Sequence, residues 1–481
     1  MKKHGKHIIF LVLLVLLFLP FLQFKTKLVP ISKLRGSVSA PVFPAWNLNA
    51  WINGEFQQQY ESAIEERIGF RPWIIRLKNQ AEFSLFHKAN ASGVVVGKKG
   101  YLYESDYIRS YQGQDFLGEW FWNEKFARLA LVRDTLTKLG VEMALVLEPG
   151  KVSFYPEYIP DHYMRDTIRP SNYDLIKTEA RKKAIPTIDL NAWFVSQKSL
   201  SEYPLFPKGG IHWSNYGMIR AVDTLLRFAD ELTYKQIPHL IIDSIEVTNE
   251  LRDTDSDLED IMNLLWNSPH PRMAYPEFSF SIVSDSLKPR VLSISDSFFF
   301  NILNAGIPGK AFANEAFWYY SNTIYPDTWT ARKDTSMINI REEVEQMDLI
   351  LLMLTERFYY KMSWNFIDHL YKQYYPDEMV NYLYDYFAAI IRNFEWFDLV
   401  QREAGRKSIS MEASMREHAF YQFWRDDQDG KIVKDAAFYA MKIRKDTTWY
   451  NKVAAKAVKN GIDVEKQLAL DALWLENQED N

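Results

Sequence analysis

Three apolar runs, each ending in polar residues, constrain the fold of this chain most strongly. They lie at residues 141–147, 291–294 and 348–355, with helical patterns between them. A short apolar run without polar alternation predicts a strand buried on both faces, as in a parallel sheet covered by helices. The first run is followed by a helical pattern at residues 172–184 and another strand at 185–190, which is βαβ spacing. We therefore expect an α/β domain with a mostly parallel sheet, and further strands at residues 239–247 and 311–320.

One of these runs delivers a serine to the edge of the predicted sheet. The strand at 291–294 breaks at Ser295-Asp296-Ser297. Sites in open α/β sheets form at the carboxyl ends of the strands. A serine there is either a nucleophile, if a histidine reaches it, or an ordinary cap of the next helix.

His212 is the histidine that we expect to reach Ser297. It is one of nine histidines and lies in a glycine-rich loop, not on an apolar helix face. Both residues fall in loops at the ends of predicted strands, so they can meet at one edge of the sheet. In such a pair the imidazole takes the hydroxyl proton and later returns it to a leaving group.

Composition excludes several classes of protein. The chain has 481 residues, enough for two or three domains, and 47% of them are hydrophobic, so it is globular. The net charge is −5 without a basic block, which argues against nucleic acid as a partner. The chain has no cysteine, which excludes disulfides, thiolate metal sites and a cysteine nucleophile. Aromatic residues, at 15%, line carbohydrate grooves or simply fill cores.

The N-terminus predicts a membrane segment. Residues 8–24 form an apolar run of about 17 residues after Lys2, Lys3 and Lys6, which suits a transmembrane helix or a signal peptide. The nearest small-residue site, at 38–40, lies too far downstream for comfortable cleavage. We expect an uncleaved signal anchor, crossing the inner membrane once, with the body of the protein in the periplasm.

The rest of the chain predicts helices at both ends of the α/β region. Residues 55–86 carry an apolar stripe at helical spacing, residues 94–103 read as a hairpin, and helical periodicity resumes near residue 364. The expected domains are an anchor and juxtamembrane segment (1–35), a linker and helical extension (36–92), the catalytic domain (93–365) and a C-terminal helical region (366–481).

Neither a metal nor a cofactor is expected. Asp253, Asp255 and Asp257 are spaced like calcium ligands, but the run lacks the glycine and glutamate of a calcium loop. We read Asp257 as the solvated start of a helix. The sequence also offers no three convergent histidines for a catalytic zinc.

Taken in order, several motifs resemble the AlgJ/AlgX-type alginate O-acetyltransferase family. After the membrane segment come Phe70-Arg71, a hairpin at 95–102, the Pro149-x-Lys151 turn, His212-Trp213 before the serine strand, and Glu356-Arg357 after a late strand. The similarity covers roughly residues 50–365. It implies an SGNH-hydrolase-like three-layer α/β/α domain, here with an N-terminal membrane helix and a C-terminal helical extension.

The resemblance also implies roles for particular residues. In the family an Asp-x-His-Trp segment supplies the acid and base of a triad, and a Gly-x-Ser turn supplies the nucleophile. His212 and Ser297 match the histidine and the serine. The acid position is Gly210 and the glycine position is Ser295, so the chain uses either a Ser–His dyad or an acid from a different segment.

Further residues are candidates for contacts that support the reaction. The backbone N–H of Ser297 is the natural oxyanion donor, because a turn into a helix presents free amides. Arg357, Lys151 and Asn322 are candidates for oxyanion or supporting contacts.

Three functions follow from the resemblance. The first is an O-acetyltransferase in which Ser297 takes an acetyl group, delivered by a membrane-bound O-acyltransferase partner, and passes it to a hydroxyl of an exported polysaccharide. The second is an acetyl esterase with the same serine and histidine but water as acceptor. The third, motivated by Gly210, is a non-catalytic member that binds polysaccharide or scaffolds an acetylation complex.

Overall fold

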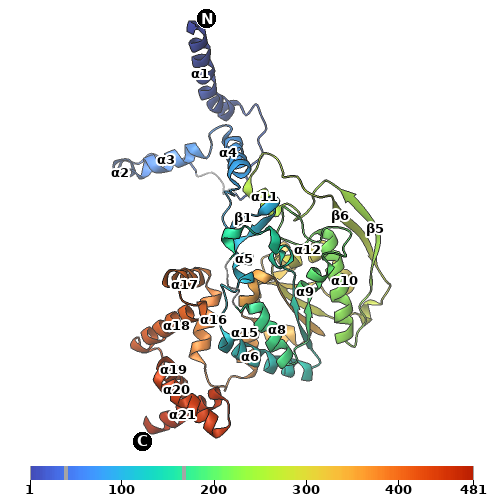
Figure 1. Ribbon diagram of the computed structural model, residues 1–481, viewed down its shortest axis with the longest axis vertical. Helices are drawn as coiled ribbons and strands as arrows, with labels where there is room; N and C mark the ends of the chain where they lie inside the picture. Colours follow the sequence, from blue (N-terminus) through green and yellow to red (C-terminus); the bar gives the residue numbers. More distant parts are fainter. Residues whose placement is uncertain (1, 37–41, 165–169, 480–481) are drawn as a thin grey trace. The chain divides into compact units, whose positions relative to one another are not determined.

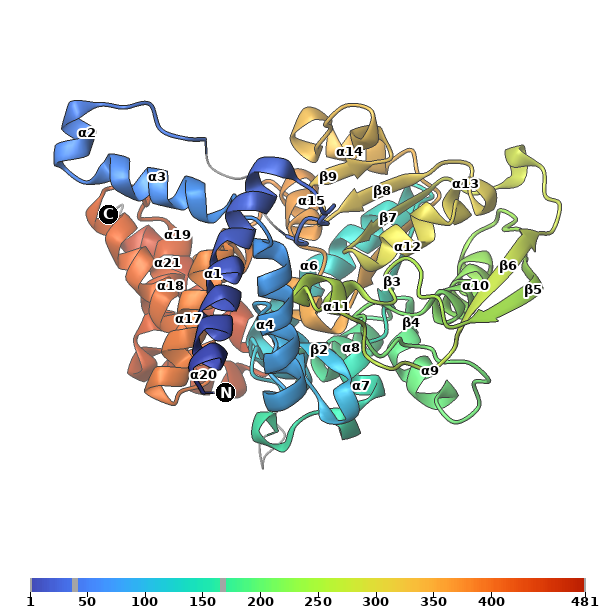
Figure 2. The ribbon, with the colours of Figure 1, turned by 90° about the horizontal axis from the view of Figure 1, so that it is seen from above.

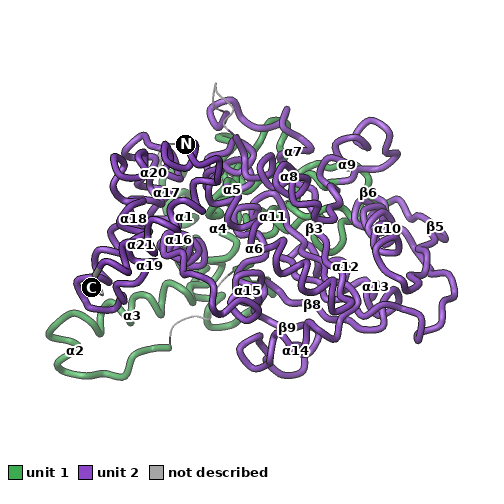
Figure 3. Tube along the Cα trace, turned by 90° about the horizontal axis from the view of Figure 1, so that it is seen from below, with its two compact units in different colours: residues 1–105, 206–214, 248–273 green, residues 106–205, 215–247, 274–481 purple. Residues whose placement is uncertain are grey.

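The computed structural model describes residues 2–36, 42–164 and 170–479. It divides into two compact units (Figure 3). Unit 1 comprises residues 1–105, 206–214 and 248–273, and unit 2 comprises residues 106–205, 215–247 and 274–481. The small-residue site at 38–40 lies outside the described residues.

Unit 2 is built on a six-stranded sheet, of which β3, β4, β7, β8 and β9 are labelled in Figure 2. The strand order is β4-β3-β10-β7-β8-β9; all neighbouring pairs are parallel except β8 and β9. This confirms the mostly parallel sheet predicted from the apolar runs. The strands are β3 (Glu142–Leu147), β4 (Thr187–Asp189), β7 (Val291–Ser295), β8 (Ala316–Tyr319), β9 (Thr323–Tyr325) and β10 (Leu349–Leu354).

Helices cover both faces of this sheet, as the three-layer prediction requires. Met143, Leu145 and Leu147 of β3 belong to one large hydrophobic cluster with α6 (Glu119–Lys138), α8 (Asn172–Lys182), α14 (Ile340–Val344) and α15 (Phe366–Tyr374). Side chains alternate along a strand, so the intervening residues of β3 face the other way. On that side lie α9 (Leu190–Gln197), which contacts β3, and α12 (Phe298–Asn304), whose Phe299 ring is 4.6 Å from that of Phe317.

Two features of unit 2 differ from the sequence-based expectation. The strand expected at 239–247 is β5 (Leu240–Thr248), but it pairs with β6 (Met273–Phe280) in a separate two-stranded sheet. The strand expected at 311–320 is shorter, because α13 (Ile307–Ala311) precedes β8. The other helices before the tail are α5 (Ser105–Tyr111), α7 (Lys151–Phe154) and α10 (Asn215–Leu232).

The C-terminal region is helical, as predicted, and is drawn from orange to red in Figure 1. Asp446 caps the first turn of one helix by accepting from the N–H groups of Thr448 and Trp449, and Gly461, with φ +64°, ends it. After α15 the helices are α16 (Tyr382–Arg392), α17 (Phe394–Lys407), α18 (Met411–Gln428), α19 (Ala436–Lys445), α20 (Thr447–Asn460) and α21 (Val464–Glu479).

These helices share the core of the α/β layers. Tyr384 stacks on Phe121 of α6 with ring centroids 5.3 Å apart, and Phe397 stacks on Tyr360 at 4.3 Å. The main hydrophobic cluster runs without a break from the sheet to Leu468. The tail therefore completes the core of unit 2.

Unit 1 begins with a long apolar helix. Among the described residues, one helix, Gly5–Thr26, is long and apolar enough to cross a membrane, which fits a single-pass anchor with a soluble body. The predicted helix pair and hairpin follow, and a further helix comes from residues after β5. The elements are α1 (Lys2–Thr26), α2 (Leu48–Ile52), α3 (Glu55–Glu65), α4 (Arg71–Phe86), β1 (Val94–Val96), β2 (Leu102–Glu104) and α11 (Asp257–Met262).

Candidate active site

Ser297 lies where the sequence placed it, in the turn between β7 and α12. The residues of β7 and the adjacent Asp296 are buried, and so are Phe298 and Phe299. Ser297 is only half-buried, so it is the accessible side chain of this turn. A buried strand thus fixes the backbone of a partly exposed hydroxyl.

Asp296 anchors the turn from inside. Its carboxylate accepts hydrogen bonds from Thr355 Oγ1 at 2.5 Å, from Thr355 N at 3.3 Å and from Phe298 N at 3.0 Å. Since Thr355 follows β10, these bonds tie the ends of two neighbouring strands together. Asp296 therefore stabilises the turn through its hydrogen bonds.

A second buried acid lies beside this turn. Ser295, at the position of the family's glycine, donates from Oγ to Glu148 Oε2 at 3.2 Å. Burial and, secondarily, the charge of Asp296 raise the pKa of Glu148 well above its usual range. Burial therefore favours the uncharged form of Glu148 beside the serine turn.

Lys151 and Glu356 follow the ends of β3 and β10, which are adjacent in the sheet. Lys151 is fully buried at the start of α7. A side chain on the preceding residue, Gly150, would place its Cβ 2.1 Å from Glu356 Oε2, so the close approach of the two loops requires glycine. Ser153 donates from Oγ to Glu356 Oε1 at 2.5 Å, and burial raises the pKa of Glu356 to about 8.

Arg357 and Asn322 complete the predicted residues of this edge. The Arg357 guanidinium lies 4.5 Å from the ring centroid of Phe358 and 6.0 Å from that of Tyr107. Asn322 is exposed in the turn between β8 and β9, where its carbonyl accepts from Thr335 N at 2.8 Å. Strands β3, β10, β7 and β8 are consecutive in the sheet, so all four loops emerge side by side.

Unit 1 holds the histidine together with an acid. The Asp257 carboxylate is hydrogen-bonded through Oδ2 to His212 Nδ1 and accepts from Ile211 N through Oδ1 at 2.8 Å. Both side chains are mostly buried. A carboxylate on Nδ1 fixes the ring and its tautomer and directs Nε2 to the opposite side, which is the geometry of the acid and base in a triad.

This pair corrects the interpretation of Asp257 as a solvated helix start. Asp257 is indeed the first residue of α11, but its side chain turns back to the His212 loop. A carboxylate therefore contacts the histidine, and it comes from 45 residues downstream of it. This is the alternative in which an acid is supplied by a different segment.

The backbone explains why residue 210 is glycine. A Cβ there would lie 2.3 Å from Thr254 O and 3.0 Å from Asp255 O. The backbone of residues 254 and 255, which leads to Asp257, lies against Gly210. The close approach that brings Asp257 to His212 therefore leaves no room for a side chain at residue 210. Glu259 N also donates to Gly209 O at 3.0 Å, which holds the two loops together.

The site residues fall into two sets. Ser297, Lys151, Arg357 and Asn322 belong to unit 2, and His212 belongs to unit 1 with Asp257. Within the described parts of the chain, no group of three or more histidine, aspartate or glutamate side chains is arranged to hold a metal ion. Asp257 was missed because the aspartates at 253, 255 and 257 resemble one another in sequence, and only the fold shows which one reaches the histidine.

Comparison with known proteins identifies relatives of the central region. Residues 94–284 match the family described as SGNH hydrolase-like domain, acetyltransferase AlgX. The chain is 26% identical over 180 residues to the probable alginate O-acetylase AlgJ of Pseudomonas aeruginosa, covering 37% of this chain and 44% of that protein. For AlgJ of Pseudomonas syringae pv. tomato the identity is 24% over 187 residues, covering 37% and 46%. The chain thus spans less than half the length of these curated relatives.

A solved structure gives a similar match. The O-acetyltransferase domain of Pseudomonas putida AlgJ is matched over 58% of this chain and 99% of that domain, with 17% identity and a TM-score of 0.38.

Proposed function

We propose that this chain, whose residues 94–284 match the family described as SGNH hydrolase-like domain, acetyltransferase AlgX, is a serine-dependent O-acetyltransferase of the cell envelope. Its acceptor is a hydroxyl of an exported polysaccharide. The observation that carries the proposal is the His212–Asp257 pair, which supplies an oriented base where the sequence alone offered only Gly210.

In the first half-reaction Ser297 becomes acetylated. Its Oγ attacks the carbonyl carbon of the acetyl donor while its proton passes to His212 Nε2. The backbone N–H of Ser297 stabilises the oxyanion, with Arg357, Lys151 and Asn322 as supporting groups. The bond between the acetyl group and the donor then breaks, and the leaving group takes the proton from the imidazolium that Asp257 stabilises.

In the second half-reaction the acetyl group moves to the sugar. A sugar hydroxyl attacks the acetyl-serine carbonyl and gives its proton to His212. Ser297 leaves as the alcohol by recovering that proton. An esterase would use the same steps with water in place of the sugar, so the acceptor decides between the two functions.

The N-terminal helix gives the proposal a place in the cell. We propose that α1 is an uncleaved anchor in the inner membrane and that the body lies in the periplasm, with residues 93–365 as the catalytic domain. A membrane-bound O-acyltransferase then supplies the acetyl groups. The support for the anchor is the length and apolar composition of α1.

Acylation of Ser297 tests the function directly. The protein is incubated with 4-nitrophenyl acetate, and ester turnover is measured together with the mass of the peptide that contains Ser297. We expect turnover and an added acetyl group in the wild type, and neither in Ser297→Ala or His212→Ala. Oligosaccharide acceptors then separate transfer from hydrolysis.

The outcome that contradicts the proposal is equal turnover by all three proteins, or silence of all three with every donor and acceptor offered. Silence favours the non-catalytic reading, in which the chain binds polysaccharide or scaffolds an acetylation complex. The presence of Asp257 beside His212 removes the observation that motivated that reading.

A further inference from the structure

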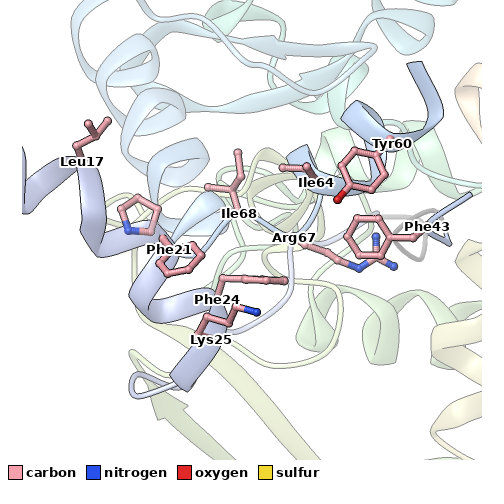
Figure 4. A pocket seen from close by; sticks show the side chains of 10 residues that line it. Leu17, Phe21, Phe24, Lys25, Phe43, Tyr60, Ile64, Arg67 and Ile68 are labelled. Atoms are coloured by element: carbon pink, nitrogen blue, oxygen red, sulfur yellow. The ribbon is translucent and has the colours of Figure 1, made fainter. Parts of the chain in front are cut away.

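A groove in unit 1 lies between the end of the apolar helix and the helix pair that follows it (Figure 4). Its volume is about 530 Å³. Leu17, Phe21 and Phe24 line it from α1, and Ile64 and Ile68 line it from α3 and the turn after it. The groove is thus walled largely by apolar side chains.

The end of α1 is packed tightly against this helix pair. A Cβ on Gly69 would lie 2.2 Å from Pro20 O and 2.8 Å from Phe24 N, so only glycine allows the approach. Gln23 holds the chain after α1 by donating to Val29 O at 2.6 Å and accepting from Val29 N at 3.1 Å. The turn between α3 and α4 is therefore held beside the C-terminal end of α1.

This contact lies at the C-terminal end of the apolar run. Pro20 and Phe24 are among the last residues of the apolar run. Leu17 precedes Phe24 by about 10 Å along the helix, at 1.5 Å per residue, and so lies deeper in the run. If α1 crosses a bilayer, the groove opens at the junction of acyl chains and headgroups. The aromatic belt of membrane proteins occurs at this level, and Phe43 and Tyr60 line the same groove.

Two cationic side chains line the groove. The Arg67 guanidinium lies 4.6 Å from the Phe43 ring centroid and donates to Ala63 O at 2.8 Å, which holds it in place. Lys25, in the last turn of α1, also lines the groove. A planar guanidinium with further N–H donors suits a phosphate oxygen.

We propose that this groove binds one phospholipid at the outer face of the membrane, with an acyl chain against Phe21, Ile64 and Ile68 and the phosphate at Arg67 and Lys25. The surrounding surface fits a membrane border as well, because its exposed side chains include the large apolar residues Trp46, Leu48, Trp51, Ile52, Trp73, Ile74 and Leu77. Residues 42–77 then form a collar that rests on the bilayer.

The absence of cysteine makes a clean test possible. The full chain, carrying either Ile64→Cys or Ser62→Cys, is labelled with a fluorophore and placed in nanodiscs of phosphatidylcholine and phosphatidylglycerol. Ile64 faces the groove, and Ser62, two residues away on the same helix, points to the opposite side. Quenching is measured with lipids brominated on the acyl chain and with aqueous iodide.

We expect the label at residue 64 to lose most of its fluorescence to brominated lipid and little to iodide, and the label at residue 62 to show the reverse. Iodide quenching at both positions means an open, water-filled groove and overturns the proposal. Shielding of residue 64 from both quenchers means that protein covers it, and brominated-lipid quenching at both positions means a wholly immersed helix; either result also overturns it. A mass of the purified chain that shows cleavage of α1 would likewise overturn the proposal.

The phosphate part has its own readout. Native mass spectrometry counts phosphatidylglycerol molecules that stay bound to the detergent-solubilised full chain. We expect Arg67→Gln to lose the bound lipid, and the matched change Lys78→Gln, at an exposed position of α4, to keep it. Equal retention by both variants contradicts a phosphate contact at Arg67.

Discussion

Three acidic side chains, one in unit 1 and two in unit 2, have contrasting surroundings. In unit 1 the Asp257 carboxylate faces hydrogen-bond donors, the imidazole of His212 and the amide of Ile211. In unit 2, Glu148 and Glu356 are buried at the carboxyl edge of the sheet, and burial raises the pKa of each. Hydrogen-bond donors thus surround the carboxylate that contacts the histidine, whereas burial disfavours the charged form of the two glutamates.

The largest effect is expected at Asp257. Asp257→Asn keeps the size of the side chain but replaces an acceptor of the His212 N–H with an amide that favours the wrong tautomer. We expect ester turnover to fall by about 10³–10⁴-fold, as for the orienting acid of a serine protease. The rate of ester turnover is to be measured for wild type and variant under the same conditions.

The control for this change lies on the same helix. Asp260 is also on α11, but its carboxylate pairs with Arg35 at 3.5 Å. Asp260→Asn should retain nearly full turnover and a similar melting temperature. A comparable loss in both variants would show that Asp257 acts only by holding α11 in place.

The next effect concerns Gly210. Gly210→Ala forces a methyl group against Thr254 O, which is backbone and cannot move aside easily. We expect the free energy of unfolding to fall by about 1–3 kcal/mol. Gly405→Ala, inside α17 with open space around it, should instead gain up to about 1 kcal/mol from helix propensity. Urea unfolding measures both, and a neutral Gly210→Ala would contradict the close approach of the two loops.

A smaller effect, on the pH dependence of stability, is expected from the buried acids Glu356 and Asp115 of unit 2. The pKa of Glu356 is raised from 4.5 to about 8 and that of Asp115 to about 7, in both cases by burial. The unfolded chain releases these protons at lower pH than the folded chain does. The free energy of unfolding should therefore decline as the pH rises from about 4.5 to about 8.

Glu356→Gln tests this assignment. Glutamine resembles the protonated acid, so we expect little loss of turnover at neutral pH and a flatter dependence of the melting temperature on pH. Differential scanning fluorimetry across this range compares it with wild type. A steeper dependence in the variant would mean that Glu356 is ionised in the folded protein.

Much of the fold was predictable because the signals are local. Each buried strand of the main sheet is a short apolar run, and Asp446 and Gly461 mark the ends of a helix by their own chemistry. β6 escaped prediction because Met273–Phe280 includes a proline and alternates only partly between buried and exposed residues. Its pairing with β5 depends on tertiary contacts, as does the exclusion of β5 from the main sheet.

The site was predictable in part for the same reason. Ser297 and His212 stand at strand ends or in a glycine-rich loop, features that a sequence displays. Asp257 and the fit of Gly210 depend on two loops that meet across 45 residues, which no local pattern records. The acylation experiment tests the proposed pairing of Ser297 with His212.

The shared core of sheet and tail has a consequence for how the protein is made. A chain is synthesised from its N-terminus, and α6 leaves the ribosome hundreds of residues before the helices that pack on it. Phe121 and the apolar face of the sheet must wait, uncovered, until Tyr384 and its neighbours arrive. The order of synthesis thus makes the last quarter of the chain the step that closes the core, and the unfinished protein a client for chaperones.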